Sequence, residues 1–109
     1  LLSHGARIHL TDSEGRTALH HAARVGFLQC VEALLNAGVD PNIADKNGLI
    51  PLHDVAYFIP SPEVATIVTS LHGYGADLEA RNKDGWTPLF IATDLGSLEA
   101  VEALVECGA

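Results

Sequence analysis

The sequence has few basic residues. It contains 6 Lys and Arg against 14 Asp and Glu, which gives a formal net charge of −8. A protein whose main partner is a nucleic acid or an anionic membrane needs clustered Lys and Arg, so we expect neither partner. No base follows Lys83, whereas Glu99, Glu102 and Glu106 fall on one stripe of a predicted helix. We interpret this acidic stripe as a solvated outer face in preference to a docking site for a basic partner.

Cysteine and long apolar runs are also scarce. The two cysteines, Cys30 and Cys107, have no C-x-x-C spacing. We interpret them as reduced thiols, which predicts a cytoplasmic or nuclear protein. No apolar run approaches the roughly 18 residues of a membrane-spanning helix, and we expect no signal peptide. Aromatic residues make up only 6%, while apolar residues make up 48%, a composition that suits small, closely packed helices.

Compact signatures of catalysis are absent. There is no G-x-S-x-G, no phosphate-binding loop and no H-E-x-x-H, and neither cysteine has a plausible histidine partner. Asp54 directly follows His53, but adjacent side chains on a helix diverge by about 100°, which makes the two a poor dyad. We therefore expect no enzymatic activity and no cofactor.

The sequence does contain an internal repeat. Gly5 and Gly38 lie 33 residues apart, as do Gly15 and Gly48, whereas Gly48 and Gly85 lie 37 apart. A fixed period of this length indicates a solenoid whose successive units share one core. The longer interval indicates a four-residue insertion in the third copy.

Short motifs return in register with these glycines. Thr17-Ala18-Leu19-His20, Ile50-Pro51-Leu52-His53 and Thr87-Pro88-Leu89-Phe90 follow one T-P-L-H pattern, and the segments 34–38 and 104–108 share a helix ending. In these motifs the chain resembles the ankyrin-repeat family over essentially its whole length. The resemblance implies an all-α solenoid of stacked antiparallel helix pairs joined by β-hairpin-like loops. It also implies a non-enzymatic module that binds a protein partner inside a larger intracellular protein.

The expected units follow from the glycine spacing. Residues 1–109 should form a single domain, with the end of a truncated repeat at 1–11, repeats at 12–44 and 45–81, and a last, truncated repeat at 82–109. Because both ends interrupt a unit, we expect a piece of a longer array with exposed terminal apolar faces. The insertion falls near 57–62, where Pro60 and Pro62 prevent a helix from continuing, so we expect a loop between two helices.

The residues at the start of the first helix differ among the three units. Thr17 can cap its helix by accepting from backbone amides, which is worth about 1 kcal/mol. Pro51 and Pro88 suit the first helical position. Ile50 replaces the capping threonine, so its helix should have the weakest start. The expected inward-facing residues are Leu19, Ala22, Ala23, Leu28, Val31, Leu34, Leu35, Val64, Ile67, Val68 and Leu71, and the second helix should end at Gly38.

Histidine invites two interpretations. His20 and His53 are equivalent positions, and His21 is adjacent to the first, so a zinc or catalytic site can be imagined. No carboxylate or cysteine joins them at ligand spacing, and we expect no metal. The resemblance instead gives His20 and His53 a role in hydrogen-bonding backbone between repeats, a role that Phe90 does not inherit.

The resemblance places partner binding on the hairpin tips and on the inner face of the first helices. Tryptophan, tyrosine and arginine are typical of binding hot spots. The expected contact residues are Arg16, Leu49 and Trp86 after the turn glycines, Lys46 and Lys83 at the tips, and Arg24, Tyr57, Phe58 and Asp94 at the helix ends. Trp86 should point away from the helix core. The alternative for Tyr57, Phe58 and Ile59 is that they fold back over the gap that their own insertion opens.

Two further interpretations remain open. Asn42, with Leu34 eight residues before it, resembles the hairpin asparagines that an oxygen-sensing hydroxylase modifies in ankyrin repeats, although a plain turn asparagine is the simpler interpretation. The domain, which we expect to be monomeric, could also be a spacer or scaffold that positions flanking domains. Nothing in the residues names the partner.

Overall fold

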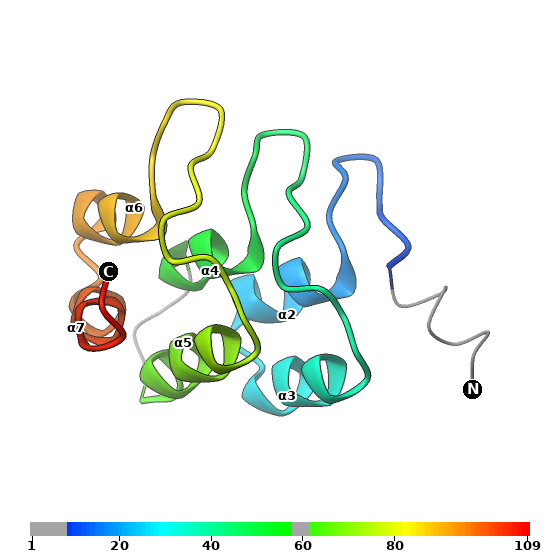
Figure 1. Ribbon diagram of the computed structural model, residues 1–109, viewed down its shortest axis with the longest axis horizontal. Helices are drawn as coiled ribbons and strands as arrows, with labels where there is room; N and C mark the ends of the chain where they lie inside the picture. The colour runs from blue at the N-terminus through cyan, green and yellow to red at the C-terminus, as the bar shows by residue number, and fades with distance from the viewer. Residues whose placement is uncertain (1–8, 58–61) are drawn as a thin grey trace.

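The structure is a computed structural model that describes residues 9–57 and 62–109 of the chain. Within these residues, antiparallel helix pairs follow one another (Figure 1). The first pair is α2 (Ala18–Val25) and α3 (Leu28–Asn36); the second is α4 (Pro51–Asp54), continued by the 3-10 helix η1 (Val55–Tyr57), and α5 (Glu63–Gly73); the third is α6 (Pro88–Leu95) and α7 (Leu98–Glu106). The described residues contain no β-strand, so the all-α expectation is confirmed.

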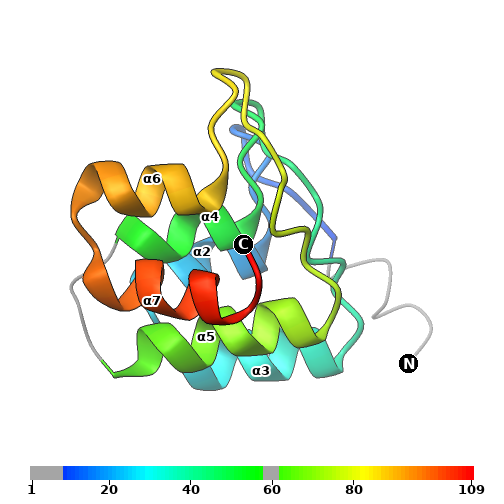
Figure 2. The same ribbon diagram turned by 60° about the vertical axis from the view of Figure 1, so that its left-hand side comes forward.

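The helices form two layers. Figure 1 shows α2, α4 and α6 in one row and α3, α5 and α7 in the other, with the hairpin-like loops projecting from the first row. The view in Figure 2 shows the same stacking from the side, with α4 between α2 and α6 and α5 between α3 and α7. Each pair therefore packs only on its neighbours, as in a solenoid. We call the contact between the first and second pairs the first interface, and that between the second and third pairs the second interface.

The helix starts match the local sequence. The Thr17 hydroxyl accepts from the amide of His20 at 3.4 Å, and the Thr87 hydroxyl accepts from Phe90 at 3.2 Å. Ile50 offers no such acceptor, as expected, but its own amide donates to Nδ1 of His53 at 3.0 Å. In that bond the side chain of His53 caps the backbone amide at the start of α4. The helix α4 runs for only 4 residues and continues as the 3-10 helix η1. Whether this is the weakest start remains a prediction.

Small apolar side chains fill the space between the layers. Of the inward residues named from the sequence, most are buried, and Ala22 and Ala23 let neighbouring helices approach closely. Leu28 and Leu34 differ, because they lie only partly buried at the edge of the core. In the described part of the chain, α3 has a neighbour in its own row on one side only, and this leaves part of both side chains uncovered.

Glycine ends the second helix of each pair. Gly38 has a φ of +99°, which is open to glycine without strain, and the next amide, that of Val39, donates back to the carbonyl of Leu34 at 3.2 Å. The same closing bond joins Ala76 to Leu71 at 3.0 Å. The helix ending expected at Gly38 is confirmed, and it turns the chain toward the next hairpin.

The hairpin tips are joined to one another by the backbone. Each turn begins with a side-chain acceptor, for example Asp45 Oδ1, which accepts from the amide of Asn47 at 2.8 Å. Across the first interface the amide of Lys46 donates to the carbonyl of Glu14 at 2.9 Å, and across the second the amide of Lys83 donates to Asn47 at 3.0 Å. The tips therefore stack in register, which aligns the side chains that they carry.

Candidate interaction surface

Buried histidines fasten both interfaces. Nδ1 of His20 accepts from the amide of Thr17 at 3.0 Å, and its Nε2 lies 2.8 Å from the carbonyl oxygen of Leu49. His53 repeats this with the amide of Ile50 at 3.0 Å and the carbonyl of Trp86 at 3.0 Å. An acceptor Nδ1 requires the proton on Nε2, so each ring is neutral and donates to the next unit. Burial lowers the pKa of both rings. The inter-repeat role that the resemblance implied is confirmed.

In this arrangement His53 cannot act with Asp54 as a catalytic dyad, because both of its ring nitrogens are already engaged with backbone. Within the described residues, no group of three or more His, Cys, Asp and Glu side chains is placed to hold a metal ion. The two cysteines are free thiols, Cys30 exposed and Cys107 partly buried. The structure thus gives His20 and His53 a structural role between the units.

Arg24 and Tyr57 meet on this surface. The Arg24 Nη2 donates to Oδ1 of Asp54 at 2.9 Å, and its Cζ lies 4.5 Å from the centroid of the Tyr57 ring. Tyr57 is 42% exposed, and about a third of the Arg24 side chain reaches solvent. A guanidinium over an aromatic face is held by a cation–π contact. Two of the predicted contact residues are therefore brought together and fixed in one geometry, while Phe58 and Ile59 lie outside the described residues.

The sequence did not predict the partner of Arg24. Asp54 is 0% exposed, and its Oδ2 has no hydrogen-bond partner among the described residues. Burial raises the pKa of its carboxyl to about 6, although the nearby Arg24 guanidinium acts in the opposite direction. The sequence spacing could have indicated this pair. Arg24 and Asp54 are 30 residues apart, which is three residues, or about one helical turn, short of the 33-residue period. Side chains at that spacing on stacked helices can reach one another.

Leu49 corrects one expected contact. It was expected to meet a partner, but it is only 7% exposed and belongs to the core. It stands one period after Arg16, whose Nε instead reaches Oδ2 of the buried Asp45 at 3.7 Å. One unit after Asp45 stands Asn82, so among the described residues the second interface has no ion pair at this place, and an apolar side chain is buried there. Leu49 contributes its carbonyl to the interface, and its side chain is not available on the surface.

Trp86 also differs from its expected orientation. It was expected to point away from the helix core, but it is partly buried against the core. Its ring meets that of Phe90 edge-on, with centroids 4.6 Å apart and planes at 78°. Phe90, at the position of the buried histidines, is 51% exposed. The two rings form an edge-to-face aromatic pair on the last unit, and such pairs add stability beyond that gained from burying their surface area.

The remaining predicted residues are more isolated. Lys46 and Lys83 are exposed at the hairpin tips, and Asp94 is exposed near the end of α6. None of the three forms an ion pair within the described residues. Their role in partner binding stays a prediction.

Asn42 is more than a turn residue. Its Nδ2 donates to the carbonyl of Gly75 at 2.9 Å, and its Oδ1 accepts from the amide of Asp77 at 2.8 Å. These bonds tie the loop after the first helix pair to the loop after the second. Hydroxylation of Asn42 stays a prediction, and a hydroxyl group would have to be accommodated beside both bonds.

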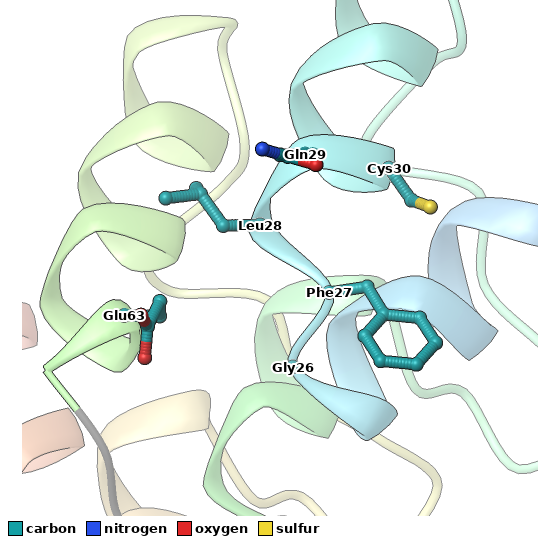
Figure 3. A pocket seen from close by; sticks show the side chains of 6 residues that line it. All are labelled: Gly26, Phe27, Leu28, Gln29, Cys30 and Glu63. Atoms are coloured by element: carbon teal, nitrogen blue, oxygen red, sulfur yellow. The ribbon is translucent and has the colours of Figure 1, made fainter.

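The described residues also form a hollow of about 400 Å³ at the start of α3, shown in Figure 3. It is lined by Gly26, Phe27, Leu28, Gln29, Cys30 and Glu63. Among its described lining residues, Glu63 is the one charged group, and no second acid or general base accompanies it there. None of the predicted contact residues is among these six. No helix in the described part of the chain has the length and hydropathy to cross a membrane.

Comparison with known proteins agrees with this architecture. The family described as "Ankyrin repeats (3 copies)" matches residues 1–67, and the family described as "Ankyrin repeat" matches residues 84–109. Neurogenic locus notch homolog protein 1 of Danio rerio is 40% identical over 107 residues, and Neurogenic locus Notch protein of Drosophila melanogaster is 37% identical over 107. Each alignment covers 97% of this chain and 4% of the relative. Ankyrin repeat protein nuc-2 of Neurospora crassa is 38% identical over 110 residues, which is 100% of this chain and 10% of that protein.

The chain thus spans a small part of the length of these relatives. The matched families cover both sides of the insertion, and the helix pairs and the stacked tips repeat in register across it. Ankyrin repeats generally mediate protein–protein interaction and are typically non-enzymatic. On the sequence motifs, the stacked helix pairs and these matches together, the chain belongs to the ankyrin-repeat family.

Proposed function

We propose that this chain is a protein-binding module and that a partner contacts it on the face formed by the hairpin tips and the first helices. The observation that carries the proposal is the Arg24–Tyr57 pair. Its guanidinium lies 4.5 Å from the ring and is anchored 2.9 Å from a buried carboxylate, yet both side chains reach solvent. Such a pair presents a charge and an aromatic surface that need no ordering when a partner binds, which lowers the cost of association.

The same proposal assigns the rest of the surface. Trp86, whose ring packs edge-on against Phe90, supplies a second aromatic contact on the last unit, and the exposed tips supply charge at the rim. The proposed contact residues are Arg16, Arg24, Lys46, Tyr57, Trp86, Lys83 and Asp94. Hot spots concentrate in a few aromatic and arginine side chains, so we expect Tyr57, Arg24 and Trp86 to dominate the affinity and the tips to tune it.

An alanine comparison tests the proposal. A partner recovered by affinity purification with the folded chain is first shown to bind directly with purified components, and its affinity is then measured by calorimetry. Tyr57→Ala and Trp86→Ala should each weaken binding about tenfold or more, equivalent to roughly 1.4 kcal/mol. Tyr74→Ala is the matched control, because Tyr74 is equally exposed but lies at the end of α5 in the other layer. Unchanged affinity in both variants, each shown by circular dichroism to be folded under the conditions of the binding measurement, would disprove the assignment.

The alternative function is a spacer or scaffold that positions flanking domains. It is favoured by apolar side chains exposed at the two ends of the described stack, Phe27 at one end and Leu98 and Val105 at the other. Such faces suit continuation by further repeats. In the full protein, a spacer would lose its partners when the flanking regions are deleted and keep them when Trp86 is mutated. The binding module would show the reverse.

The setting that we propose is a monomeric domain of a larger cytoplasmic or nuclear protein. Its partner is a protein, because the net charge of −8 disfavours nucleic acid and anionic membranes. Its units are residues 12–44, 45–81 and 82–109, after the end of a unit at 1–11. Light scattering tests the monomer directly, and binding to duplex DNA at low salt would contradict the expected partner class.

A further inference from the structure

The two interfaces differ in what they bury. In the first, the side chain of Asp54 in α4 meets Arg24 of α2. One unit later, the positions of these residues are taken by Ile91 and Tyr57, and Ile91 is 1% exposed. The interior thus holds a carboxylate in one interface and an aliphatic side chain at the matching place in the other. A buried ionised carboxyl group costs stability, and a buried ion pair often stabilises a protein no more than apolar side chains of similar volume.

We propose that the Arg24–Asp54 pair makes the first interface a pH-responsive joint: mild acidification neutralises Asp54 and releases Arg24 from α4, while the second interface is unchanged. The inference concerns the free chain, so it holds whether or not Arg24 contacts a partner.

The geometry supports this in three ways. The carboxylate is fully buried, so losing its charge removes a desolvation cost. Its Oδ2 has no partner among the described residues and is free to carry the added proton. Arg24 is partly exposed and packs on the Tyr57 ring, so its guanidinium can turn to solvent once its ionic partner is neutral, without leaving a buried charge.

The charged groups that act on Asp54 are Arg24 from α2 and, at longer range, Asp45 and Arg16 from the hairpins. Burial is the largest influence and raises the pKa of the Asp54 carboxyl to about 6, while Arg24 opposes it. Protonation of this carboxyl therefore falls close to neutral pH instead of near its ordinary value of 3.8.

The other titratable groups on elements packed against α4 do not bond to Asp54 within the described residues. On α2, His20 is held neutral by its backbone partners, and burial lowers its pKa. His21 instead faces Asp12, with its Nε2 3.0 Å from Oδ2. Asp94 of α6 and Glu63 of α5 are exposed. Asp54 is thus the buried carboxyl of this joint whose pKa burial raises toward neutral pH.

An NMR titration tests the joint on the intact chain. The Asp54 side-chain carbon is assigned through its bonds to the backbone and followed from pH 8 to pH 4.5, together with the Arg24 Nε–H group and the Ile91 methyl groups. We expect an Asp54 midpoint near 6, about two units above an ordinary aspartate. The Arg24 signal should shift with the same midpoint, and the Ile91 methyl signals should not. An Asp54 midpoint near 4, or an Arg24 signal that ignores the titration of Asp54, would overturn the proposal.

Two variants separate the pair from a general change in folding. In Arg24→Gln the carboxylate loses its cation, so the Asp54 midpoint should move upward from the wild-type value. In Asp54→Asn the pH-dependent shift of Arg24 should disappear. An unchanged Asp54 midpoint in Arg24→Gln would show that the two groups are not coupled. Should Asp54→Asn fail to fold, the wild-type and Arg24→Gln titrations still decide the outcome.

Discussion

The first and second interfaces share their backbone contacts and differ in two side-chain contacts. Both have one buried histidine that donates to the next unit and one backbone bond between hairpin tips. At two further places the first interface is ionic and the second is not: Arg16–Asp45 is replaced by Leu49 and Asn82, and Arg24–Asp54 is replaced by Tyr57 and Ile91. The repeated contacts maintain the stack, and the substituted positions give each joint its own properties.

The two ion pairs should not make the first interface more stable than the second. Removing two charges from water costs free energy that their attraction only partly returns, and well-packed apolar replacements are often neutral or stabilising. The raised pKa of Asp54 is a direct sign of that cost. The comparison therefore predicts a first interface that is sensitive to charge and pH, and a second that is sensitive to shape.

Breaking the ion pair should have the largest effect. Arg24→Ala leaves the Asp54 carboxylate buried without its cation, and we expect a loss of about 3 kcal/mol in unfolding free energy at pH 7.5. The double variant Arg24→Tyr with Asp54→Ile copies the second interface and should recover most or all of that loss. Urea unfolding measures both. A double variant as unstable as Arg24→Ala would contradict the comparison.

Glycine substitutions at the tips test the shape of both interfaces. A Cβ on Gly48 would lie 2.8 Å from the amide nitrogen of Lys83, one on Gly15 would lie 3.3 Å from that of Lys46, and one on Gly85 would meet nothing within 4 Å. All three have φ near +80°, so their conformational cost is shared. We expect Gly85→Ala to lose about 1 kcal/mol, Gly15→Ala about 1.5 and Gly48→Ala about 2.5. Equal losses in thermal unfolding would mean that the tips do not constrain one another.

The pH dependence of stability separates the interfaces further. The pKa of Asp54 is higher in the folded state than in the unfolded state, so its contribution is fully present below about pH 4 and is lost as the pH rises through about 6. The two buried histidines have lowered pKa values, so theirs is present above the unfolded pKa of about 6.5 and is lost as the pH falls below it.

These opposite signs make a difference measurement necessary. Subtracting the unfolding free energy of Asp54→Asn from that of the wild type should leave a term that falls by about 2 kcal/mol between pH 4.5 and pH 7.5. The histidines contribute to both proteins and cancel. A flat difference across this range would mean that Asp54 titrates as an ordinary carboxyl.

The smallest expected effect concerns the cation–π contact. Tyr57→Ala removes the ring on which Arg24 packs, and we expect a stability loss of about 0.5 to 1 kcal/mol. Tyr57→Phe retains an aromatic face and should lose less, which makes it the matched control. Chemical unfolding at pH 7.5 is sensitive enough to compare them. Equal losses in the two variants would place the contribution of Tyr57 in its hydroxyl group.

Much of the fold was predictable because the signals are local. Thr17 caps its helix within one turn, Gly38 ends another within one turn, and the inward Leu and Ala residues recur at helical spacing. The role of His20 and His53 followed from the family resemblance. The candidate site was only partly predictable: Arg24 and Tyr57 were named, but the burial of Leu49 and the packing of Trp86 were not. Equivalence between repeats predicts the position of a residue in its unit, but it does not predict which side chains of the neighbouring unit that residue contacts.

The sequence by itself determined the period, the capped helix starts and the glycine-marked helix ends, because caps, turns and apolar spacing act over one or two helical turns. Only the tertiary structure decided that Asp54 would be buried, that Arg24 would reach it, and that Leu49 would leave the surface. These outcomes depend on residues about 30 positions apart meeting at a particular offset between stacked helices. Whether a buried carboxylate such as that of Asp54 is paired depends on which side chain the neighbouring helix places beside it, and the local sequence pattern does not predict that neighbour.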